Sequence, residues 1–114
     1  VDSDVYPGVI IGFNAITAVG TDGIISSYDI RTGEEIWSTE ALRFRELSPP
    51  AVIGEFLGVV DLEGILHLLK PKTGDIFGRA DTGGDKGLVA PVNLGSGALV
   101  LLKNGRLTRV DINR

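Results

Sequence analysis

The chain has 114 residues, of which 43% are hydrophobic, and a formal net charge of -4 from 11 basic and 15 acidic residues. It contains no basic block or stripe, so nucleic acid is not an expected partner, because phosphate binding needs clustered positive charge. The absence of cysteine excludes disulfides, thiolate metal ligands and a cysteine nucleophile within this segment. The 16 glycines and 5 prolines favour short strands joined by tight turns.

The first third of the chain predicts four strands after a short polar loop at residues 1–8. Asp22-Gly23 is a strong hairpin signal, because the tight turn requires positive φ values that glycine tolerates. Thr21 begins that turn, and Thr32-Gly33 forms the next one. The predicted strands cover residues 9–11, 16–19, 24–30 and 35–38.

The same plan recurs in the rest of the chain. Residues 56–60 and 65–69 are apolar at successive positions, which predicts strands buried on both faces, as in sheets packed face to face. The chain ends where the outer strand of the last repeat is due, so that sheet is expected to have an unpaired edge. The predicted strands cover residues 50–53, 56–60, 65–69 and 75–79, and then 90–93, 98–103 and 107–112.

A fixed period of 41 residues relates the three parts. It places Gly23 on Gly64 and then on Gly105, and Gly33 on Gly74. A period of about 40 residues with four short strands is typical of a β-propeller blade, and closed propellers have about four to eight blades. The sequence therefore predicts an all-β fragment of a larger ring, a single partial propeller domain over residues 1–114. Its blades cover approximately residues 9–41, 50–82 and 90–114. Because the chain begins with Val1 and contains no methionine, we expect it to be part of a longer protein.

Three features suggest chemistry at first sight. The segment Gly83-Gly84-Asp85-Lys86-Gly87 resembles a phosphate-binding loop, but no helix is predicted after it, so we expect a connection between blades. Asp81 and Asp85 lack the spacing of a calcium loop and are expected to be solvated. His67, the single histidine, occupies the slot of Ser26 and Thr108, and no carboxylate that could orient it stands out nearby, which favours a structural role. No catalytic, cofactor-binding or metal-ligating residue is expected.

Other residue types recur with the repeat. Asp29 and Asp111 both stand at the end of the third strand of a blade, where a carboxylate is expected to accept hydrogen bonds from the turn. Trp37, with Phe77 near its counterpart, is expected to fill space between blades.

The connection after the first blade is a candidate partner-binding site. Leu42-Arg43-Phe44-Arg45-Glu46-Leu47 mixes large apolar residues with arginines, a combination enriched at protein interfaces, and Arg43, Phe44 and Arg45 are the candidate residues. In the alternative, which we favour, Leu42, Phe44 and Leu47 lie between blades while the arginines face water.

Two resemblances to known proteins follow from these motifs. Residues 27–37, Ser-Tyr-Asp-Ile-Arg-Thr-Gly-Glu-Glu-Ile-Trp, resemble the quinoprotein-type propeller repeat. Residues 47–67, with Asp-Leu-Glu-Gly-Ile-Leu-His at their end, and residues 102–107, Leu-Lys-Asn-Gly-Arg-Leu, resemble the last part of the BamB family of outer-membrane β-barrel assembly lipoproteins. The likeness extends over most of residues 9–112. Lys70 in place of the repeat aspartate, and Phe77 in place of tryptophan one residue early, depart from the repeat.

The resemblance to the BamB family implies the C-terminal blades of an eight-bladed, noncatalytic scaffold without a cofactor. Such a protein lies on the periplasmic side of the outer membrane, anchored by an N-terminal lipid outside this segment. The implied partners are the periplasmic domains of BamA and unfolded outer-membrane proteins. The alternative is a segment of a quinone-dependent dehydrogenase, which would carry a docking tryptophan in nearly every blade, whereas this chain has 1. Uncovered blade faces and edges also predict self-association.

Overall fold

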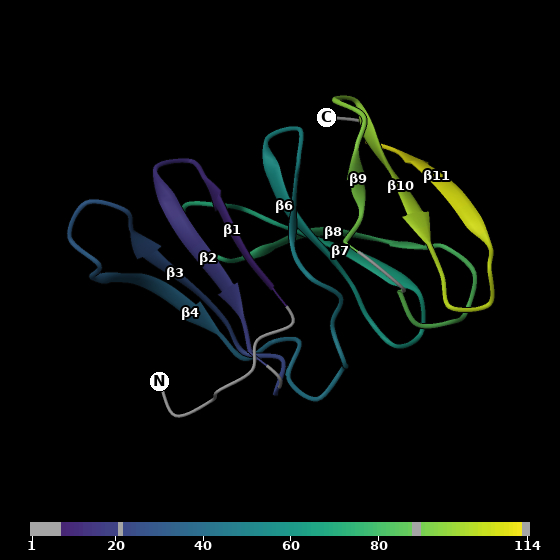
Figure 1. Ribbon diagram of the computed structural model, residues 1–114, viewed down its shortest axis with the longest axis horizontal. Coiled ribbons are helices and arrows are strands. Elements are labelled where there is room, and N and C mark those ends of the chain that lie inside the picture. The colour runs from purple at the N-terminus through teal and green to yellow at the C-terminus, as the bar shows by residue number, and fades with distance from the viewer. Residues whose placement is uncertain (1–7, 21, 88–89, 113–114) are drawn as a thin grey trace.

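The computed structural model describes residues 8–20, 22–87 and 90–112, which form three antiparallel sheets arranged as a fan (Figure 1). The fan measures 39 × 30 × 18 Å. Blade 1 comprises β1 (Gly8–Gly12), β2 (Ala15–Val19), β3 (Ile25–Asp29) and β4 (Glu35–Thr39). Blade 2 comprises β5 (Ala51–Ile53), β6 (Phe56–Val60), β7 (Ile65–Leu69) and β8 (Ile76–Asp81). Blade 3 comprises β9 (Val92–Asn93), β10 (Gly97–Leu101) and β11 (Leu107–Asp111).

Each sheet is a meander in which strands pair in chain order, and the first strands of neighbouring blades, β1 with β5 and β5 with β9, lie against one another. All eleven predicted strands are present. Those over residues 56–60 and 65–69 have the predicted ends, and the ends of the others differ from the prediction by at most two residues. The shortest is β9, which covers only the last part of the predicted strand over residues 90–93. Predictions that fall on residues 1–7, Thr21, residues 88–89 and residues 113–114 lie outside the described residues. Among the residues that the structure describes, there is no helix with the length and apolar character needed to span a membrane.

The turns and irregularities follow the 41-residue period. Gly23, Gly64 and Gly105 have φ values of 87°, 76° and 88°, a left-handed conformation that disfavours any side chain with a Cβ atom. Strand register shifts between Ser27 and Tyr28 in blade 1, and between Leu68 and Leu69 at the equivalent place in blade 2. The repeat therefore extends to the bulges, which the sequence pattern did not predict.

Two hydrophobic cores lie between the blades. The core between blades 1 and 2 contains Val19, Ile25, Trp37, Leu42, Leu47, Leu57, Val59 and Leu69. The core between blades 2 and 3 contains Ala51, Ile53, Phe56, Val60, Leu66, Leu68, Ala98, Val100 and Leu102. Successive residues of β6 alternate between the two cores, so the prediction that this strand is buried on both faces is confirmed.

Trp37 fills space between blades 1 and 2 as predicted. Its ring packs over Gly74, and its indole Nε1 donates a hydrogen bond of 2.8 Å to the Pro71 carbonyl oxygen. Phe77 does not play the same part, because it is 43% exposed and stacks on Phe56 of its own blade at 4.2 Å between ring centroids. Phe77 comes one residue earlier in the repeat than Trp37 and is the extra residue of a β-bulge, because Leu68 pairs with Gly78 and Leu69 with Ile76.

Candidate functional site

The loop at residues 40–50, between β4 and β5, is fixed to the fan at both ends. Leu42 and Leu47 are buried in the core between blades 1 and 2, as the favoured interpretation predicted. Backbone hydrogen bonds of 2.8 Å run from Phe44 N to the Asp22 oxygen and from Ser48 N to the Val60 oxygen. The loop is therefore held against the β2–β3 turn of blade 1 and the end of β6.

Phe44 does not lie between the blades, so the favoured interpretation is wrong at this residue. Its side chain is 73% exposed, and the Arg43 guanidinium lies over its ring at 4.8 Å from the centroid. Its φ value is 63°, and that of Glu46 is 50°, in a region that bulky residues rarely adopt. Anchored leucines on either side impose this conformation, which costs free energy and presents an aromatic ring to solvent.

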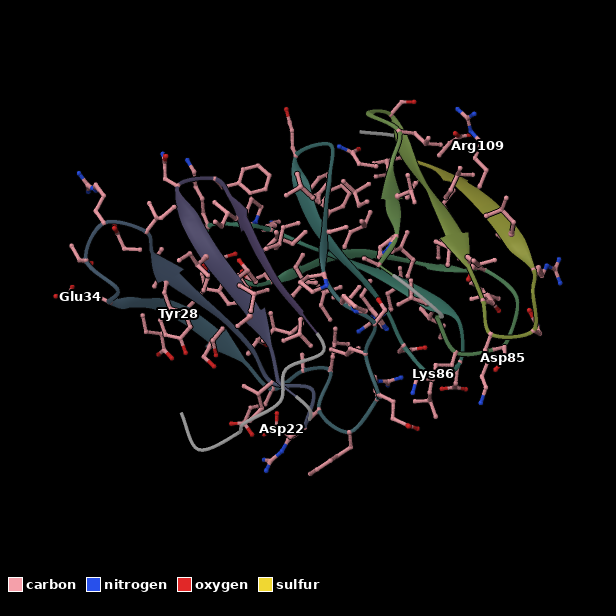
Figure 2. All side chains as sticks on the ribbon, in the orientation of Figure 1. Asp22, Tyr28, Glu34, Asp85, Lys86 and Arg109 are labelled. Carbon is pink, nitrogen blue, oxygen red and sulfur yellow. The ribbon has the colours of Figure 1, made fainter. Side chains whose placement is uncertain are left out.

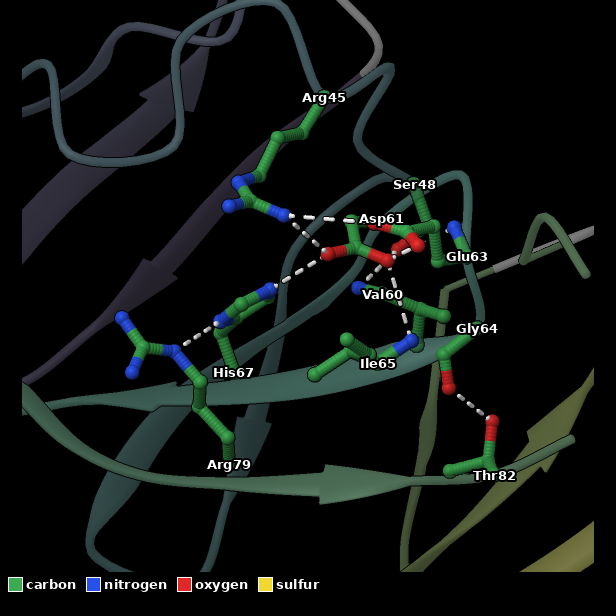
Figure 3. A network of polar contacts seen from close by, with 10 residues as sticks. All are labelled: Arg45, Ser48, Val60, Asp61, Glu63, Gly64, Ile65, His67, Arg79 and Thr82. Atoms are coloured by element: carbon green, nitrogen blue, oxygen red, sulfur yellow. Dashed lines mark hydrogen bonds and ion pairs between the residues drawn. The ribbon is translucent and has the colours of Figure 1, made fainter. Parts of the chain in front are cut away.

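The two arginines of the loop differ in their surroundings. Arg43 makes an exposed ion pair of 2.7 Å with Glu40. Arg45 points inward, with Nη1 3.3 Å from Oδ2 of the buried Asp61 and 3.8 Å from Glu63 Oε1 (Figure 3). The expectation that both arginines simply face water is therefore wrong for Arg45, which joins the loop to blade 2.

Asp61, at the end of β6, is the centre of a buried polar network. Its Oδ1 accepts hydrogen bonds from the backbone N–H groups of Glu63 and Ile65 at 2.8 and 3.1 Å, which closes the β6–β7 turn. Its Oδ2 accepts from Nε2 of His67 at 2.8 Å. On the far side of the ring, Arg79 Nε donates to His67 Nδ1 at 3.3 Å, as Figure 3 shows.

The protonation states of this network follow from its hydrogen bonds. Because Arg79 donates to Nδ1, His67 is neutral and carries its hydrogen on Nε2. Burial lowers the pKa of His67, and the Asp61 carboxylate only partly opposes this. Burial alone would raise the pKa of Asp61, but hydrogen bonds from His67 and from the turn N–H groups outweigh it and hold the pKa below its ordinary value.

The sequence analysis missed this network. It found no carboxylate to orient His67, whereas Asp61 is six residues away and in direct contact. A signal was present, because Asp61 and His67 both interrupt the repeat: the slot of Asp61 holds Gly20 and Leu102 in the other blades. Pairing of β7 with β8 then brings Arg79 opposite His67. Since His67 is 1% exposed, its ring is out of reach of a substrate. Its part is to hold the Asp61 carboxylate, which in turn contacts Arg45 of the loop.

The glycine-rich segment at residues 82–87 connects blades 2 and 3. The Thr82 N–H donates to the Gly64 oxygen, the Thr108 hydroxyl to the Thr82 oxygen and the Lys103 N–H to the Lys86 oxygen, at 2.7 to 2.9 Å. This agrees with the predicted connection between blades.

The aspartates singled out in the sequence make local contacts. Asp29 Oδ1 accepts from the backbone N–H groups of Arg31 and Thr32, as predicted for a turn acceptor. Asp111 accepts instead from the Arg109 side chain at 3.0 Å. Asp81 and Asp85 accept from nearby backbone N–H groups, and the described residues contain no cluster of three or more His, Asp or Glu side chains placed to hold a metal ion.

The chain is similar to several outer membrane protein assembly factors of the BamB family. It matches no protein-family model. It is 30% identical to the outer membrane protein assembly factor BamB of Legionella pneumophila, over 97% of this chain and 29% of that protein. It is 36% identical to BamB of Pseudomonas aeruginosa, over 94% of this chain and 28% of that protein. The chain thus spans less than a third of the length of these curated relatives.

Solved structures agree with the sequence similarity. The crystal structure of BamB from Moraxella catarrhalis superposes with a TM-score of 0.81 and 27% identity, over 91% of this chain and 30% of that one. A computationally designed protein, Ika8, superposes with a TM-score of 0.76 at 17% identity, over 91% of this chain and 32% of that one, and supports the fold alone. The predicted propeller fragment is thereby confirmed.

Proposed function

Because this chain is homologous along almost its whole length to one part of the BamB proteins, we propose that it is a noncatalytic adaptor in the assembly of outer-membrane β-barrel proteins. In this proposal residues 1–114 form one continuous part, the C-terminal blades, of an eight-bladed propeller on the periplasmic side of the outer membrane. The homology favours the adaptor over the quinone-dependent dehydrogenase. No cofactor is required for this function.

The proposed partner is the periplasmic region of BamA, and the proposed contact is the loop that carries Arg43, Phe44 and Arg45. The observation that supports it is the exposed ring of Phe44, held in a strained backbone conformation between two buried leucines. Aromatic residues and arginine are enriched among the residues that dominate binding energy at interfaces, and a ring already fixed in place loses little entropy on binding. Arg45 and the Asp61 network keep the loop in this position.

The test is a titration of the purified chain against the periplasmic domains of BamA, followed by calorimetry. We expect saturable binding that Phe44→Asn weakens by at least about tenfold, the effect of removing a central aromatic contact. Asparagine tolerates positive φ values, so the loop keeps its shape.

Phe13→Asn is the matched control. Phe13 is also exposed at positive φ, 56°, but lies in the β1–β2 turn at the opposite end of blade 1 from the loop. If the two variants bind the BamA domains with equal affinity, the loop is not part of the contact with BamA. An unmodified chain that fails to bind BamA at all would contradict the proposed partner.

A further inference from the structure

A pocket of about 390 Å³ lies at the end of the core between blades 2 and 3 that is uppermost in Figure 1. Its lining comes from residues 53–56 around the β5–β6 turn, from Gly95 and Ser96 in the β9–β10 turn, and from Ile112. Both walls belong to blades that the chain contains, so the pocket is internal to the fan. Its volume is near the lower end of the range for small-molecule sites and is enough for one aromatic side chain.

The equivalent place between blades 1 and 2 is reached by a tryptophan. The indole of Trp37 donates to the Pro71 carbonyl oxygen, and the 41-residue period places Pro71 on Ile112, which lines the pocket. The slot of Trp37 in blade 2 holds Gly78, and a Cβ atom on this glycine would meet no other atom within 4 Å. Blade 2 therefore sends no indole toward Ile112.

A second aromatic side chain of blade 1 also has no counterpart in blade 2. The slot of Phe13 holds Gly54, and the φ values of the two residues are 56° and 59°. A Cβ atom on Gly54 would lie 3.0 Å from the Gly95 oxygen, so a side chain at this position is directed at blade 3. The pocket thus lies where the second interface lacks two aromatic side chains that the first interface has.

Hydrogen bonds fix the walls of the pocket in place. Asn93 Oδ1 accepts from the Gly54 N–H at 3.2 Å and from the Gly95 N–H at 2.8 Å, which joins the two turns. The Ile112 N–H donates to the Ser96 oxygen at 2.8 Å. A pocket that is already formed loses little conformational entropy when a ligand binds.

The lining favours a neutral aromatic ligand that can donate a hydrogen bond. Phe56, stacked on Phe77 at 4.2 Å between ring centroids, offers a fixed ring with which another ring pairs favourably. Ile53 and Ile112 add apolar surface, whereas Glu55 is a carboxylate and the lining residues include no basic side chain. These features suit an indole, whose N–H is a donor, and disfavour an anion.

We propose that this pocket binds the side chain of a tryptophan on an extended segment of a partner protein. Trp37 is the example of this contact within the chain, because its indole N–H donates to the carbonyl oxygen that is equivalent to that of Ile112. The site is independent of the proposed function, because it opens at the edge of the fan opposite the loop at residues 40–50. Figure 2 shows Asp22, which is hydrogen-bonded to that loop, and Lys86 at the lower edge of the fan.

The test is a titration of the isotope-labelled chain with N-acetyl-tryptophanamide, followed by NMR. We expect saturable shifts of the backbone amides of Gly54, Gly95 and Ser96, with a Kd in the millimolar range or tighter. N-acetyl-leucinamide should bind at least about tenfold more weakly, because it has no ring to pair with Phe56. Indole-3-acetate should also bind more weakly than the tryptophan amide, because its carboxylate is repelled by Glu55.

A capped peptide, Ser-Thr-Trp-Thr-Ser, tests whether the tryptophan can belong to an extended segment. We expect it to bind at least as tightly as N-acetyl-tryptophanamide, because its chain leaves the pocket on both sides of the tryptophan. If the amide binds and the peptide does not, the partner is not a protein and the pocket takes a small aromatic molecule instead.

Two variants fill the pocket from opposite walls. Gly54→Phe gives blade 2 the residue that blade 1 carries at a similar φ value, and Ser96→Phe adds a ring at an exposed residue of blade 3. Each is expected to weaken the binding of N-acetyl-tryptophanamide by at least about tenfold. Glu34→Phe is the control, at an exposed turn residue of blade 1 far from the pocket (Figure 2), and should bind like the unmodified chain.

Circular dichroism checks that each variant is folded, and Ser96→Phe alone decides the test if Gly54→Phe is not. Three results would overturn the proposal. They are pocket amides that do not shift at any concentration of N-acetyl-tryptophanamide, equal affinities for the tryptophan and leucine amides, and folded pocket-filling variants that bind like the unmodified chain.

Discussion

At the scale of single residues, the central feature is a fully buried carboxylate, both oxygens of which have hydrogen-bond or ion-pair partners. Asp61 accepts two backbone N–H groups on one oxygen and contacts His67 and Arg45 with the other. A buried charge is tolerated in a protein only when it is paired and hydrogen-bonded. Asp61 therefore joins three elements, namely the β6–β7 turn, the strand β7 and the loop that carries Phe44.

The stability of the fold is expected to depend strongly on Asp61. Asp61→Ala leaves two backbone N–H groups and the His67 Nε2–H without their acceptor, and should lower the free energy of unfolding by about 3 kcal/mol. Urea denaturation measures this change. Asp29→Ala is the control, because it removes an exposed turn carboxylate with two similar backbone contacts, and it should lower the free energy of unfolding clearly less. Equal losses of unfolding free energy in the two variants would mean that burial of the carboxylate does not matter.

The neutral state of His67 predicts a pH dependence. The pKa of His67 is lowered in the folded chain from its ordinary value of 6.5, so below about pH 6.5 the unfolded chain binds a proton that the folded chain does not. The free energy of unfolding should therefore be highest above pH 6.5 and fall as the pH is lowered toward 5. Asp61, with its pKa below the ordinary 3.8, also loses stability on acidification, but only at lower pH.

Since the chain has 1 histidine, a single variant isolates this effect. His67→Gln should remove the slope between pH 7.5 and 5 in urea denaturation, while it keeps an amide in contact with Asp61. A slope of the same size in the variant would assign the pH dependence to other groups.

At the scale of elements, the contact between blade 1 and the β7–β8 turn shows how closely two blades approach. A Cβ atom on Gly74 would lie within 2.4 Å of the Trp37 ring. The equivalent residue in blade 1, Gly33, has a similar φ value of 75° but open space around it. The repeat thus offers two glycines with the same conformation and different surroundings.

Alanine at these two positions separates conformation from packing. Gly33→Ala should destabilise the fold by about 1 kcal/mol, the cost of a left-handed conformation. Gly74→Ala adds a clash with Trp37 and should cost about 3 kcal/mol, since overpacking contributes a further 1 to 3 kcal/mol. Urea denaturation measures both values, and the fluorescence of Trp37 should change only in Gly74→Ala. Similar losses of unfolding free energy in the two variants would mean that the Trp37 ring moves away from the added methyl group at no cost.

At the scale of the whole molecule, the blades are unequal. Blade 2 is covered on both faces, whereas blades 1 and 3 each leave one face exposed. In repeat proteins each unit is stabilised chiefly by its neighbours, so a unit with two neighbours is the most stable.

Hydrogen exchange should reveal this order. Amides of β6 and β7 are expected to exchange most slowly, and those of β1 and β11 most rapidly, because local opening needs less free energy where fewer contacts are lost. If the amides of β10 and β11 exchange most slowly instead, blade 2 is not the most stable blade.

The sequence by itself determined the strands, the turns and the period that relates them. These features depend on neighbouring residues: alternation of apolar side chains marks a strand, and glycine at positive φ marks a turn, as at Gly23 and Gly64. The similarity of residues 47–67 to the BamB family was also visible in the sequence.

Only the tertiary structure decided which polar residues meet and which apolar residues remain exposed. His67 contacts Asp61 across a turn and Arg79 across a strand pair, and Phe44 is exposed because buried leucines fix the loop on either side of it. Such contacts depend on strand register, bulges and the packing of one blade on another. The local pattern of residues carries none of this, since the same loop composition suits a buried or an exposed ring.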